Sequence, residues 1–523
     1  MEACDLEAGS RLAPALATSS TLSRMTEHTD VIIIGAGLSG IGAAAHLAMR
    51  CPEKKVVLLE TRDSIGGTWD LFRYPGIRSD SDMYTFGFSF KPWMEDKTLA
   101  DGASIMRYLR EVVTEHRIED KIRYGQRVTR MSWSSESARW TLDITKKDGT
   151  SETRTCDFVY SCTGYYDYAG GYDPEFAGRD SFRGTVVHPQ KWPEGLDYTN
   201  KKVVVIGSGA TAVTLVPEMA KTAAHVTMLQ RSPTYIASVP SRDKIANALR
   251  ARLPSKVAYG ITRWKNVGLG MFLYQMSRRR PDRVKSWLVG LAKKEIGDKS
   301  DIAHFTPSYN PWDQRLCAVP DGDLFQTIRE GNAEVVTDHI DRFTEKGILL
   351  KSGRELEADI IVTATGLKVL FLGGIELRVD GQRVPVSEKL LYKGMMIQDV
   401  PNLALAFGYT NASWTLKADL TSEYVCRLLK HMDSTGMRMC TPRPDPDVLE
   451  APFLTFSSGY VQRAAAALPK QGTKRPWRLY MNYALDTLAI RYDRIDDGTL
   501  KFERGGRRTE REVPVASPTF ATR

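Results

Sequence analysis

Two glycine-rich turns, far apart in the chain, carry residue types that bind dinucleotides. The first, Gly35-Ala36-Gly37-Leu38-Ser39-Gly40, follows the apolar run 31–34 and precedes small apolar residues typical of a helix. A second apolar run, 56–59, ends in Glu60. Glycines let the backbone approach a pyrophosphate, the helix start offers free N–H groups, and a carboxylate accepts hydrogen bonds from ribose hydroxyls. The sequence therefore predicts an adenine dinucleotide site at Gly35, Gly37, Ser39, Gly40 and Glu60.

The second turn is followed by a cation where the first is followed by an acid. The apolar run 202–206 enters Gly207-Ser208-Gly209-Ala210-Thr211-Ala212, and a helix is predicted over 211–220. The next predicted strand, 225–229, ends at Gln230-Arg231. A ribose that carries a 2′-phosphate needs a cation there. We therefore predict NADPH on the second unit, with contacts from Gly207, Gly209, Ala210, Thr211 and Arg231, and FAD on the first.

Two further stretches hold residues suited to chemistry. Gly66-Gly67-Thr68-Trp69 begins a segment that ends at Asp80. Its glycines would let the backbone lie against a flat ring that Trp69 walls, although an ordinary glycine-rich loop is the alternative. Between the two units lies His188, beside Pro189. Such a histidine is either structural or, because of its place at the domain junction, functional.

These stretches carry a family resemblance. Residues 182–193 match the pattern F-x-G-x-x-x-H-x-x-x-W-P, and residues 66–80 match G-G-x-W-x-x-x-R-Y-P-G-x-x-x-D. In both patterns the chain resembles the Baeyer–Villiger type flavin monooxygenases, over nearly everything from residue 26 to residue 494. It is most like the mycobacterial members that activate thioamide prodrugs.

The resemblance implies an activity and roles for residues. It implies that NADPH reduces FAD, that O2 forms a C4a-peroxyflavin, and that a ketone becomes an ester or lactone, with sulfur of thioamides or sulfides also oxygenated. Arg315 then corresponds to the catalytic arginine, Asp80 to the aspartate that pairs with it near the flavin, and His188 to the moving domain junction. Gly67, Thr68 and Trp69 would contact the flavin, as would the segment 409–414 at a helix start.

These sites require strands that end side by side, so the sequence predicts an α/β fold with two Rossmann-like dinucleotide-binding domains. The apolar runs 158–162 and 360–364 end in Thr-Gly turns, where the chain is predicted to pass between the domains. The predicted order is a disordered leader (1–27), the first part of the FAD domain (28–165), a linker with the fingerprint (166–199), the NADP domain (200–340), the second part of the FAD domain (341–500) and a disordered tail (501–523).

Composition excludes several classes of protein. The 523 residues are 42% hydrophobic and 26% charged, which is ordinary for a soluble chain of two or three domains. No run approaches the roughly 18–20 apolar residues of a membrane span. Seven cysteines without a C-x-x-C pair argue against a disulfide framework or metal site and favour a reducing cytoplasm. The net charge of +9 is modest and no nucleic-acid motif occurs, so nucleic-acid binding is not expected.

Positive charge is concentrated in residues 241–300. This segment holds fifteen Lys and Arg against four Asp and Glu, an excess of eleven positive charges. It is predicted to be a mostly helical elaboration of the NADP domain. Its charges form either a solvated face or a surface for peripheral contact with anionic lipid at the inner face of the membrane. The oligomeric state stays open.

Three alternatives compete with the Baeyer–Villiger interpretation. One is a flavin monooxygenase that oxygenates only nitrogen or sulfur. Another is a pyridine-nucleotide disulfide reductase, but Cys156 and Cys162 lie along one apolar run without the spacing of a redox pair. The third is a non-catalytic flavoprotein redox sensor, which would not need Asp80, His188 and Arg315 together.

Overall fold

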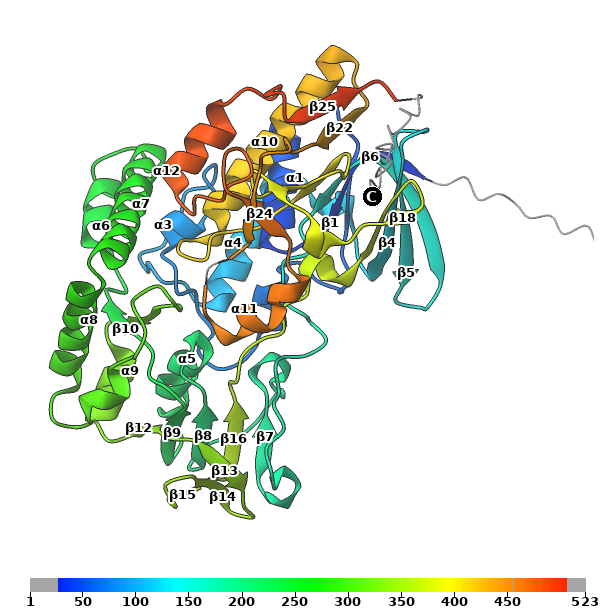
Figure 1. The fold of residues 1–523 in the computed structure, drawn as a ribbon. Coiled ribbons are helices and arrows are strands. Elements are labelled where there is room, and N and C mark those ends of the chain that lie inside the picture. Colours follow the sequence, from blue (N-terminus) through cyan, green and yellow to red (C-terminus); the bar gives the residue numbers. More distant parts are fainter. Residues whose placement is uncertain (1–26, 455, 506–523) are drawn as a thin grey trace, which may run out of the picture.

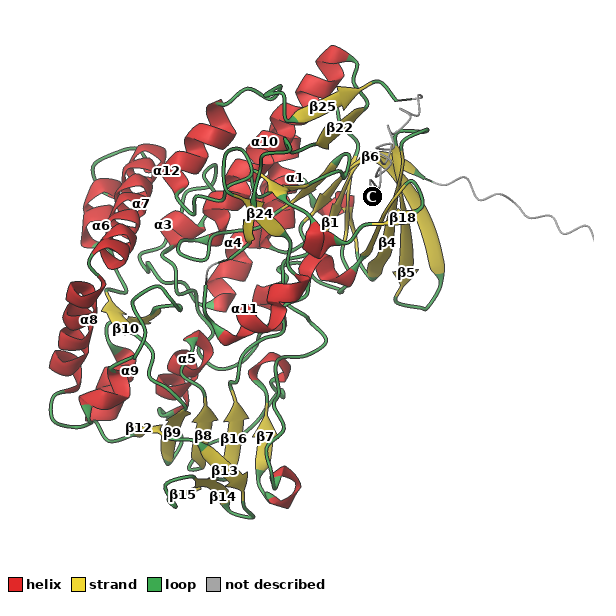
Figure 2. Cartoon of the chain, viewed as in Figure 1, coloured by secondary structure: helices red, strands yellow, loops and turns green. Residues whose placement is uncertain are grey.

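In the computed structural model, which describes residues 27–454 and 456–505, the chain folds around two sheets that each contain parallel strands. Figure 1 shows the larger sheet in the upper half of the molecule, the smaller one in the lower half, and a group of helices along one side. In Figure 2 helices cover the larger sheet toward this group, while the strands β4 and β5 lie on the side away from these helices. The predicted α/β fold with two Rossmann-like units is confirmed.

The first sheet carries the first glycine turn. Its strands run in the order β18-β17-β4-β5-β6-β1-β2-β3, with β21 paired to β6 and the β19–β20 hairpin paired to β21 through β20. Along β1, Val31 and Ile33 pack toward the helices, whereas Ile32 and Ile34 pack toward the antiparallel strands, because successive side chains of a strand alternate. Burial on both faces explains why this strand is a continuous apolar run. The strands are β1 (His28–Ile34), β2 (Val56–Leu59), β3 (Ile122–Arg123), β4 (Gln126–Ser134), β5 (Arg139–Lys146), β6 (Ser151–Ser161), β17 (Glu376–Val379), β18 (Gln382–Arg383), β19 (Leu391–Tyr392), β20 (Met396–Ile397) and β21 (Leu403–Leu405).

Helices from both ends of the chain complete this domain. The longest, α10, packs beside α1, with Leu420 and Tyr424 in the same buried cluster as Ile41. The helices are α1 (Leu38–Arg50), α2 (Thr68–Leu71), α3 (Met83–Phe86), α4 (Gly102–Glu115), α10 (Trp414–Thr435), α11 (Gly459–Ala464) and α12 (Tyr483–Asp486), the last continued by a π-helical turn (Thr487–Tyr492). Two small ladders pair β22 (Met439–Pro442) with β25 (Leu500–Glu503) and β23 (Glu450–Pro452) with β24 (Lys470–Gly472).

The second sheet is parallel throughout and carries the second glycine turn. Its order is β12-β9-β8-β16-β7. These strands are β7 (Thr185–Val187), β8 (Lys202–Ile206), β9 (His225–Gln230), β12 (Ala333–Thr337) and β16 (Ile360–Thr363). The helices of this domain are α5 (Ala210–Met219) and α9 (Asp323–Arg329). Two smaller sheets accompany them, the pair β10 (Ile236–Val239) and β11 (Cys317–Pro320) and the antiparallel strands β13 (Ile340–Phe343), β14 (Gly347–Leu350) and β15 (Glu355–Glu357).

The strand pairings differ from the predicted domain boundaries in three places. The segment 341–363 was predicted in the FAD domain, but β16 pairs with β8 and β7 and therefore belongs to the second sheet. The predicted linker 166–199 also supplies β7 to that sheet. The predicted tail begins too early, since β25 pairs with β22 through residue 503. These pairings join segments far apart in sequence, which local patterns do not reveal. Residues 1–26 and 506–523 lie outside the described residues, so disorder there is not tested.

The basic segment is helical, as predicted, and it bridges the two domains. It comprises α6 (Lys244–Arg250), α7 (Ser255–Arg279) and α8 (Pro281–Ile296). Arg263 of α7 is buried against the first domain, where its guanidinium donates to the carbonyls of Tyr84 and Gly87 at 2.8 and 2.7 Å. Ala292 and Ile296 of α8 pack in the core of the second domain. Within residues 27–454 and 456–505, no helix is both long and apolar enough to span a bilayer.

Candidate active site

One cavity of about 610 Å³ is lined by the ends of both glycine turns and by the segment between them. Eleven of the residues singled out from the sequence line it: Gly35, Gly37, Ser39, Glu60, Gly67, Thr68, Trp69, Asp80, Ala210, Thr211 and Arg315. Five others do not: Gly40, Gly207, Gly209, Arg231 and His188. The tertiary structure thus brings residues from four separate stretches into one hollow between the domains.

The first turn has the shape that a pyrophosphate requires. Gly35 has φ +101°, and a Cβ there would lie 2.7 Å from the carbonyl oxygen of Cys162. A Cβ on Gly40 would lie 1.9 Å from the oxygen of Gly35, so this third glycine allows the helix to pack against the turn rather than lining the cavity. Helix α1 begins without a side-chain cap, which leaves its first N–H groups for a ligand. The cradle fits a dinucleotide.

Glu60 braces this turn from the end of β2. Its carboxylate accepts hydrogen bonds from the backbone N–H of Ala36 at 2.7 Å and of Arg62 at 2.9 Å. Burial raises the pKa of Glu60, and these hydrogen bonds oppose that rise. Each carboxylate oxygen has a second lone pair, so Glu60 can hold the turn and still accept from a ribose hydroxyl.

The second turn repeats this construction. Gly207 has φ +135°, and a Cβ there would lie 2.4 Å from the carbonyl oxygen of Ala364. Ala364 at the end of β16 is therefore the counterpart of Cys162 at the end of β6, and each precedes a Thr-Gly turn. Arg231 is exposed directly after β9, and the neighbouring Ser232 accepts a hydrogen bond from the Ser208 hydroxyl through its carbonyl at 3.3 Å.

The segment 66–80 runs from the first turn to the second domain. Gly66 forms a backbone bridge with Gly37. Farther along, Phe72 and Tyr74 are buried in the core of the second domain, and Arg78 pairs with Asp323 of α9 at 2.5 Å. This segment is therefore the seam of the two domains, and it delivers Asp80 to the cavity between them.

Arg315 and Asp80, 235 residues apart, meet in this cavity. The Nη1 of Arg315 lies 3.4 Å from Oδ2 of Asp80, and the two side chains remain 39% and 31% exposed to the hollow. The charge of Asp80 raises the pKa of Arg315, against the effect of burial, so the guanidinium is a fixed cation. The loop that carries Arg315 is held against α7, because Arg278 of α7 pairs with Asp313 at 2.6 Å.

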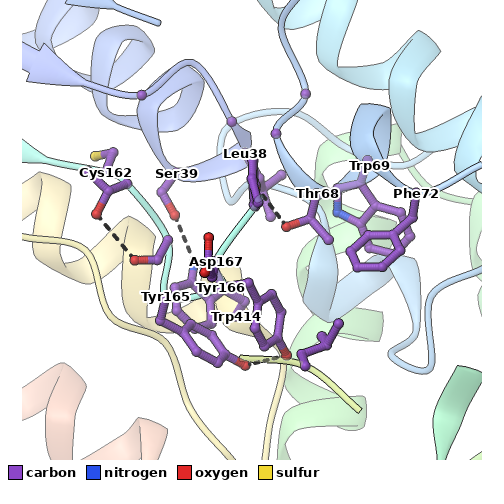
Figure 3. A pocket seen from close by; sticks show the side chains of 18 of the residues that line it. Leu38, Ser39, Thr68, Trp69, Phe72, Cys162, Tyr165, Tyr166, Asp167 and Trp414 are labelled. Carbon is purple, nitrogen blue, oxygen red and sulfur yellow. Dashed lines mark hydrogen bonds between the residues drawn. The ribbon is translucent and has the colours of Figure 1, made fainter. Parts of the chain in front are cut away.

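Three aromatic residues wall the same cavity: Tyr165 and Tyr166, which the sequence patterns did not single out, and Trp414, which ends the segment 409–414 named from the resemblance. Tyr165 stacks on Trp414 with ring centroids 5.2 Å apart, and its hydroxyl lies 2.8 Å from that of Tyr166. The indole N–H of Trp414 donates to Ser39 Oγ at 2.7 Å (Figure 3). Burial raises the pKa of both tyrosines, which stay neutral. The two tyrosines directly follow the first Thr-Gly turn, and Trp414 begins α10. These positions in the sequence were the signals that could have pointed to the cavity wall.

His188 lies outside the cavity lining, at the end of β7. Its Nδ1 accepts from the backbone N–H of Gln190 at 3.1 Å, and a Cβ on Gly171 would fall 2.0 Å from its ring. Nε2 is buried without a hydrogen-bond partner among the described residues. Burial lowers the pKa of His188, which favours the neutral ring. His188 thus follows an edge strand of the second sheet and is not among the residues that line the cavity.

Comparison with known proteins defines the class. The profile of the flavin-binding monooxygenase-like family matches residues 28–434, and the chain belongs to this family. The fold is that of solved monooxygenases: an oxidized steroid monooxygenase bound to NADP superposes with a TM-score of 0.71 at 21% identity, covering 91% of this chain and 100% of that one. The structure of OTEMO with FAD and NADP gives 0.67 at 22% identity, over 80% of this chain and 87% of that one.

Two curated relatives are much more similar in sequence. The putative FAD-containing monooxygenase MymA of Mycobacterium tuberculosis is 53% identical over 485 residues, which cover 91% of this chain and 98% of MymA. The FAD-containing monooxygenase EthA of the same organism is 53% identical over 481 residues, with the same coverage. The predicted family, fold and flavin monooxygenase class are confirmed, and these names agree with the predicted cofactors.

Proposed function

We propose that this flavin-binding monooxygenase uses FAD, NADPH and O2 to insert one oxygen atom into ketones, giving esters or lactones. Ketone, NADPH, a proton and O2 yield ester, NADP⁺ and water. The observation that carries the proposal is the Arg315–Asp80 pair at 3.4 Å, in a cavity that both dinucleotide turns line. Bound flavin supplies the redox chemistry, taking hydride from NADPH and activating O2.

The residues of the chain hold and aim these groups. The first turn, Glu60 and the segment 67–69 hold FAD, and the second turn with Arg231 holds NADPH. Arg315 stabilises the negative charge that develops on the carbonyl oxygen of the ketone, and Asp80 orients its guanidinium. Tyr165, Tyr166 and Trp414 exclude water from this charge, which strengthens the electrostatic effect of Arg315. His188 acts through the junction between the domains.

The same cavity also suits sulfur compounds. A thiocarbonyl or sulfide sulfur accepts an oxygen atom without migration of carbon, so it needs less charge stabilisation from Arg315. We propose thioamides as second substrates. A flavin monooxygenase confined to nitrogen and sulfur would oxidise the thioamide and leave every ketone unchanged, which separates the two functions.

The test is a substrate panel with the purified holoenzyme. Cyclic, linear and aryl ketones and one thioamide are incubated with NADPH under ¹⁸O2, and NADPH consumption is compared with product mass. We expect an ester from at least one ketone that carries one ¹⁸O atom, and an S-oxide from the thioamide. NADPH consumption balanced by hydrogen peroxide alone, for every compound, would contradict the proposal.

Arg231→Ala is expected to raise the KM for NADPH by about 10- to 100-fold and leave the KM for NADH unchanged. A charge-assisted hydrogen bond to the 2′-phosphate contributes about 1.5–3 kcal/mol, and NADH has no such phosphate. Steady-state kinetics with both coenzymes measure the effect. Lys201→Ala is the control, since this exposed cation precedes β8 at the opposite end of the sheet. Equal losses with both coenzymes would show that Arg231 acts on the fold instead.

The proposal includes a place of action. We infer that the enzyme works in the cytoplasm at the inner face of the membrane, where apolar ketones accumulate.

A further inference from the structure

The outward side of α7 carries large apolar side chains that the candidate site does not use. Val257, Ile261, Trp264 and Phe272 are spaced by four, three and eight residues, which places them along one face of a helix. Trp264 is 51% exposed and Phe272 61%. The opposite face is buried through residues such as Tyr259. A helix that is apolar on two opposite faces is expected to be covered on both.

A second segment extends this surface. In the helical stretch 483–492 the exposed side chains Leu485, Leu488 and Tyr492 recur at intervals of three and four residues, again one face of a helix. The rings of Trp264 and Tyr483 lie 5.5 Å apart and join this stretch to α7, and Figure 1 shows α12 next to α7. We call the seven residues Val257, Ile261, Trp264, Phe272, Leu485, Leu488 and Tyr492 the docking face. Apolar surface gathered in this way marks an interaction site.

The charge around the docking face identifies the partner. Of the fifteen cations in residues 241–300, only Arg250, Arg263, Lys265 and Arg278 pair with an acid within the described parts of the chain. Unpaired cations on α7 and at its ends include Lys256, Arg279 and Arg280, all exposed. Apolar side chains rimmed by cations bind anionic lipid by burial and electrostatic attraction together. A second copy of this chain would bring the same positive charge to the contact, which opposes self-association there.

Helix α7, which carries part of the docking face, also lines a second cavity. This hollow of about 250 Å³ is lined by Tyr274 and Arg278 of α7 and by Tyr480 and Met481, which lie just before Asn482, the N-cap of the helical stretch 483–492. It is further lined by Trp312 of the loop that carries Arg315. The elements that form the docking face therefore lead toward the loop of the proposed catalytic arginine.

We propose that the docking face binds the surface of an anionic lipid bilayer and presents the enzyme to ketones dissolved in the lipid. Binding to the bilayer is inferred from this surface alone. Access to ketones in the lipid rests also on the proposed function.

The test is flotation of the holoenzyme with large unilamellar vesicles of phosphatidylglycerol or phosphatidylcholine. We expect at least tenfold tighter binding to phosphatidylglycerol, weakened by salt. Ile261→Ser/Phe272→Ser/Leu488→Ser should lower the affinity at least tenfold, because three insertions into the lipid interface are lost. Arg279→Gln/Arg280→Gln/Arg283→Gln should lower only the affinity for phosphatidylglycerol and flatten its salt dependence. Arg278 is left intact because it clamps Asp313.

Controls separate docking from folding and from catalysis. Leu449→Ser removes an exposed leucine (68%) elsewhere and should bind vesicles as the wild type does. Flavin absorbance and a thermal melt verify that each variant folds, and Arg315→Ala should float normally, so failure of the oxygenase proposal leaves this one standing. Equal binding to both lipids, unchanged binding by the serine variant, or conversion of a dimer to a monomer by that variant in light scattering would each overturn the proposal.

Discussion

Replacing Arg315 by alanine is expected to lower the rate of ester formation about 10²- to 10³-fold while NADPH still reduces the bound flavin. Loss of one preorganised donor at a developing oxyanion typically costs about 3–4 kcal/mol. The cavity holds Arg315 as a fixed cation beside Asp80, whereas the first glycine turn, which would hold the flavin, is a separate part of the cavity lining. Stopped-flow bleaching of the flavin and chromatography of the ester measure the two half-reactions separately.

Three further variants sharpen this result. Arg315→Lys keeps a charge but loses the planar guanidinium, so an intermediate rate is expected. Asp80→Asn keeps the shape and removes the carboxylate, and it should also slow ester formation without affecting flavin reduction. Arg342→Ala is the matched control, an exposed arginine of the same domain in a surface ion pair with Asp341. If Arg315→Ala made ester at the wild-type rate, the assigned role would be wrong.

Replacing Asp419 by alanine is expected to destabilise the protein by about 3–5 kcal/mol, because the change leaves buried charge uncompensated. Asp419 on α10 is 2% exposed and lies 3.1 Å from His46 of α1 and 3.4 Å from Arg263 of α7. It also accepts from the backbone N–H of Ser89 at 2.7 Å. The loss should appear in urea unfolding curves. It should also loosen α7, which would expose the segment 241–300 to proteolysis.

The control for this variant lies on the same helix. Asp433→Ala removes an acid of α10 that is 48% exposed and pairs with Lys54 at 2.7 Å. Exposed pairs of this kind contribute about 0–1 kcal/mol. Similar losses of stability from Asp419→Ala and Asp433→Ala would show that burial does not determine how strongly the contacts of Asp419 stabilise the fold.

The contribution of Asp419 to the stability of the fold is expected to depend on pH. Burial alone raises the pKa of Asp419, but the hydrogen bond from His46 and the charges of His46 and Arg263 outweigh it and lower that pKa. The pKa of this carboxyl is lower in the folded protein than its value of about 3.9 in the unfolded chain. Such a carboxyl stabilises the fold at any pH above the unfolded value, and this stabilisation is lost as the pH falls through the folded pKa. The stability difference between wild type and Asp419→Ala should therefore shrink as the pH falls below about 4.

Much of the fold follows from local sequence, because the features concerned are local in their physics. A glycine with positive φ before a helix start, at Gly35 and Gly207, is a matter of backbone sterics within a few residues. The strands around them are continuous apolar runs because both faces of each strand are buried. The helical character of 241–300 was equally visible in the sequence.

The tertiary structure alone decided what these units bring together. The sequence named Arg315 and Asp80 through resemblance, but their meeting depends on a seam at 66–80 packed into the second domain. It did not place β16 in the second sheet or Tyr165 against Trp414, since these contacts join distant segments. Arg263 looked like one more cation of a solvated face, yet burial beside Asp419 makes it an anchor. Spacing determines which residues can share an element, whereas pairing and burial across the whole chain determine which residues share a site.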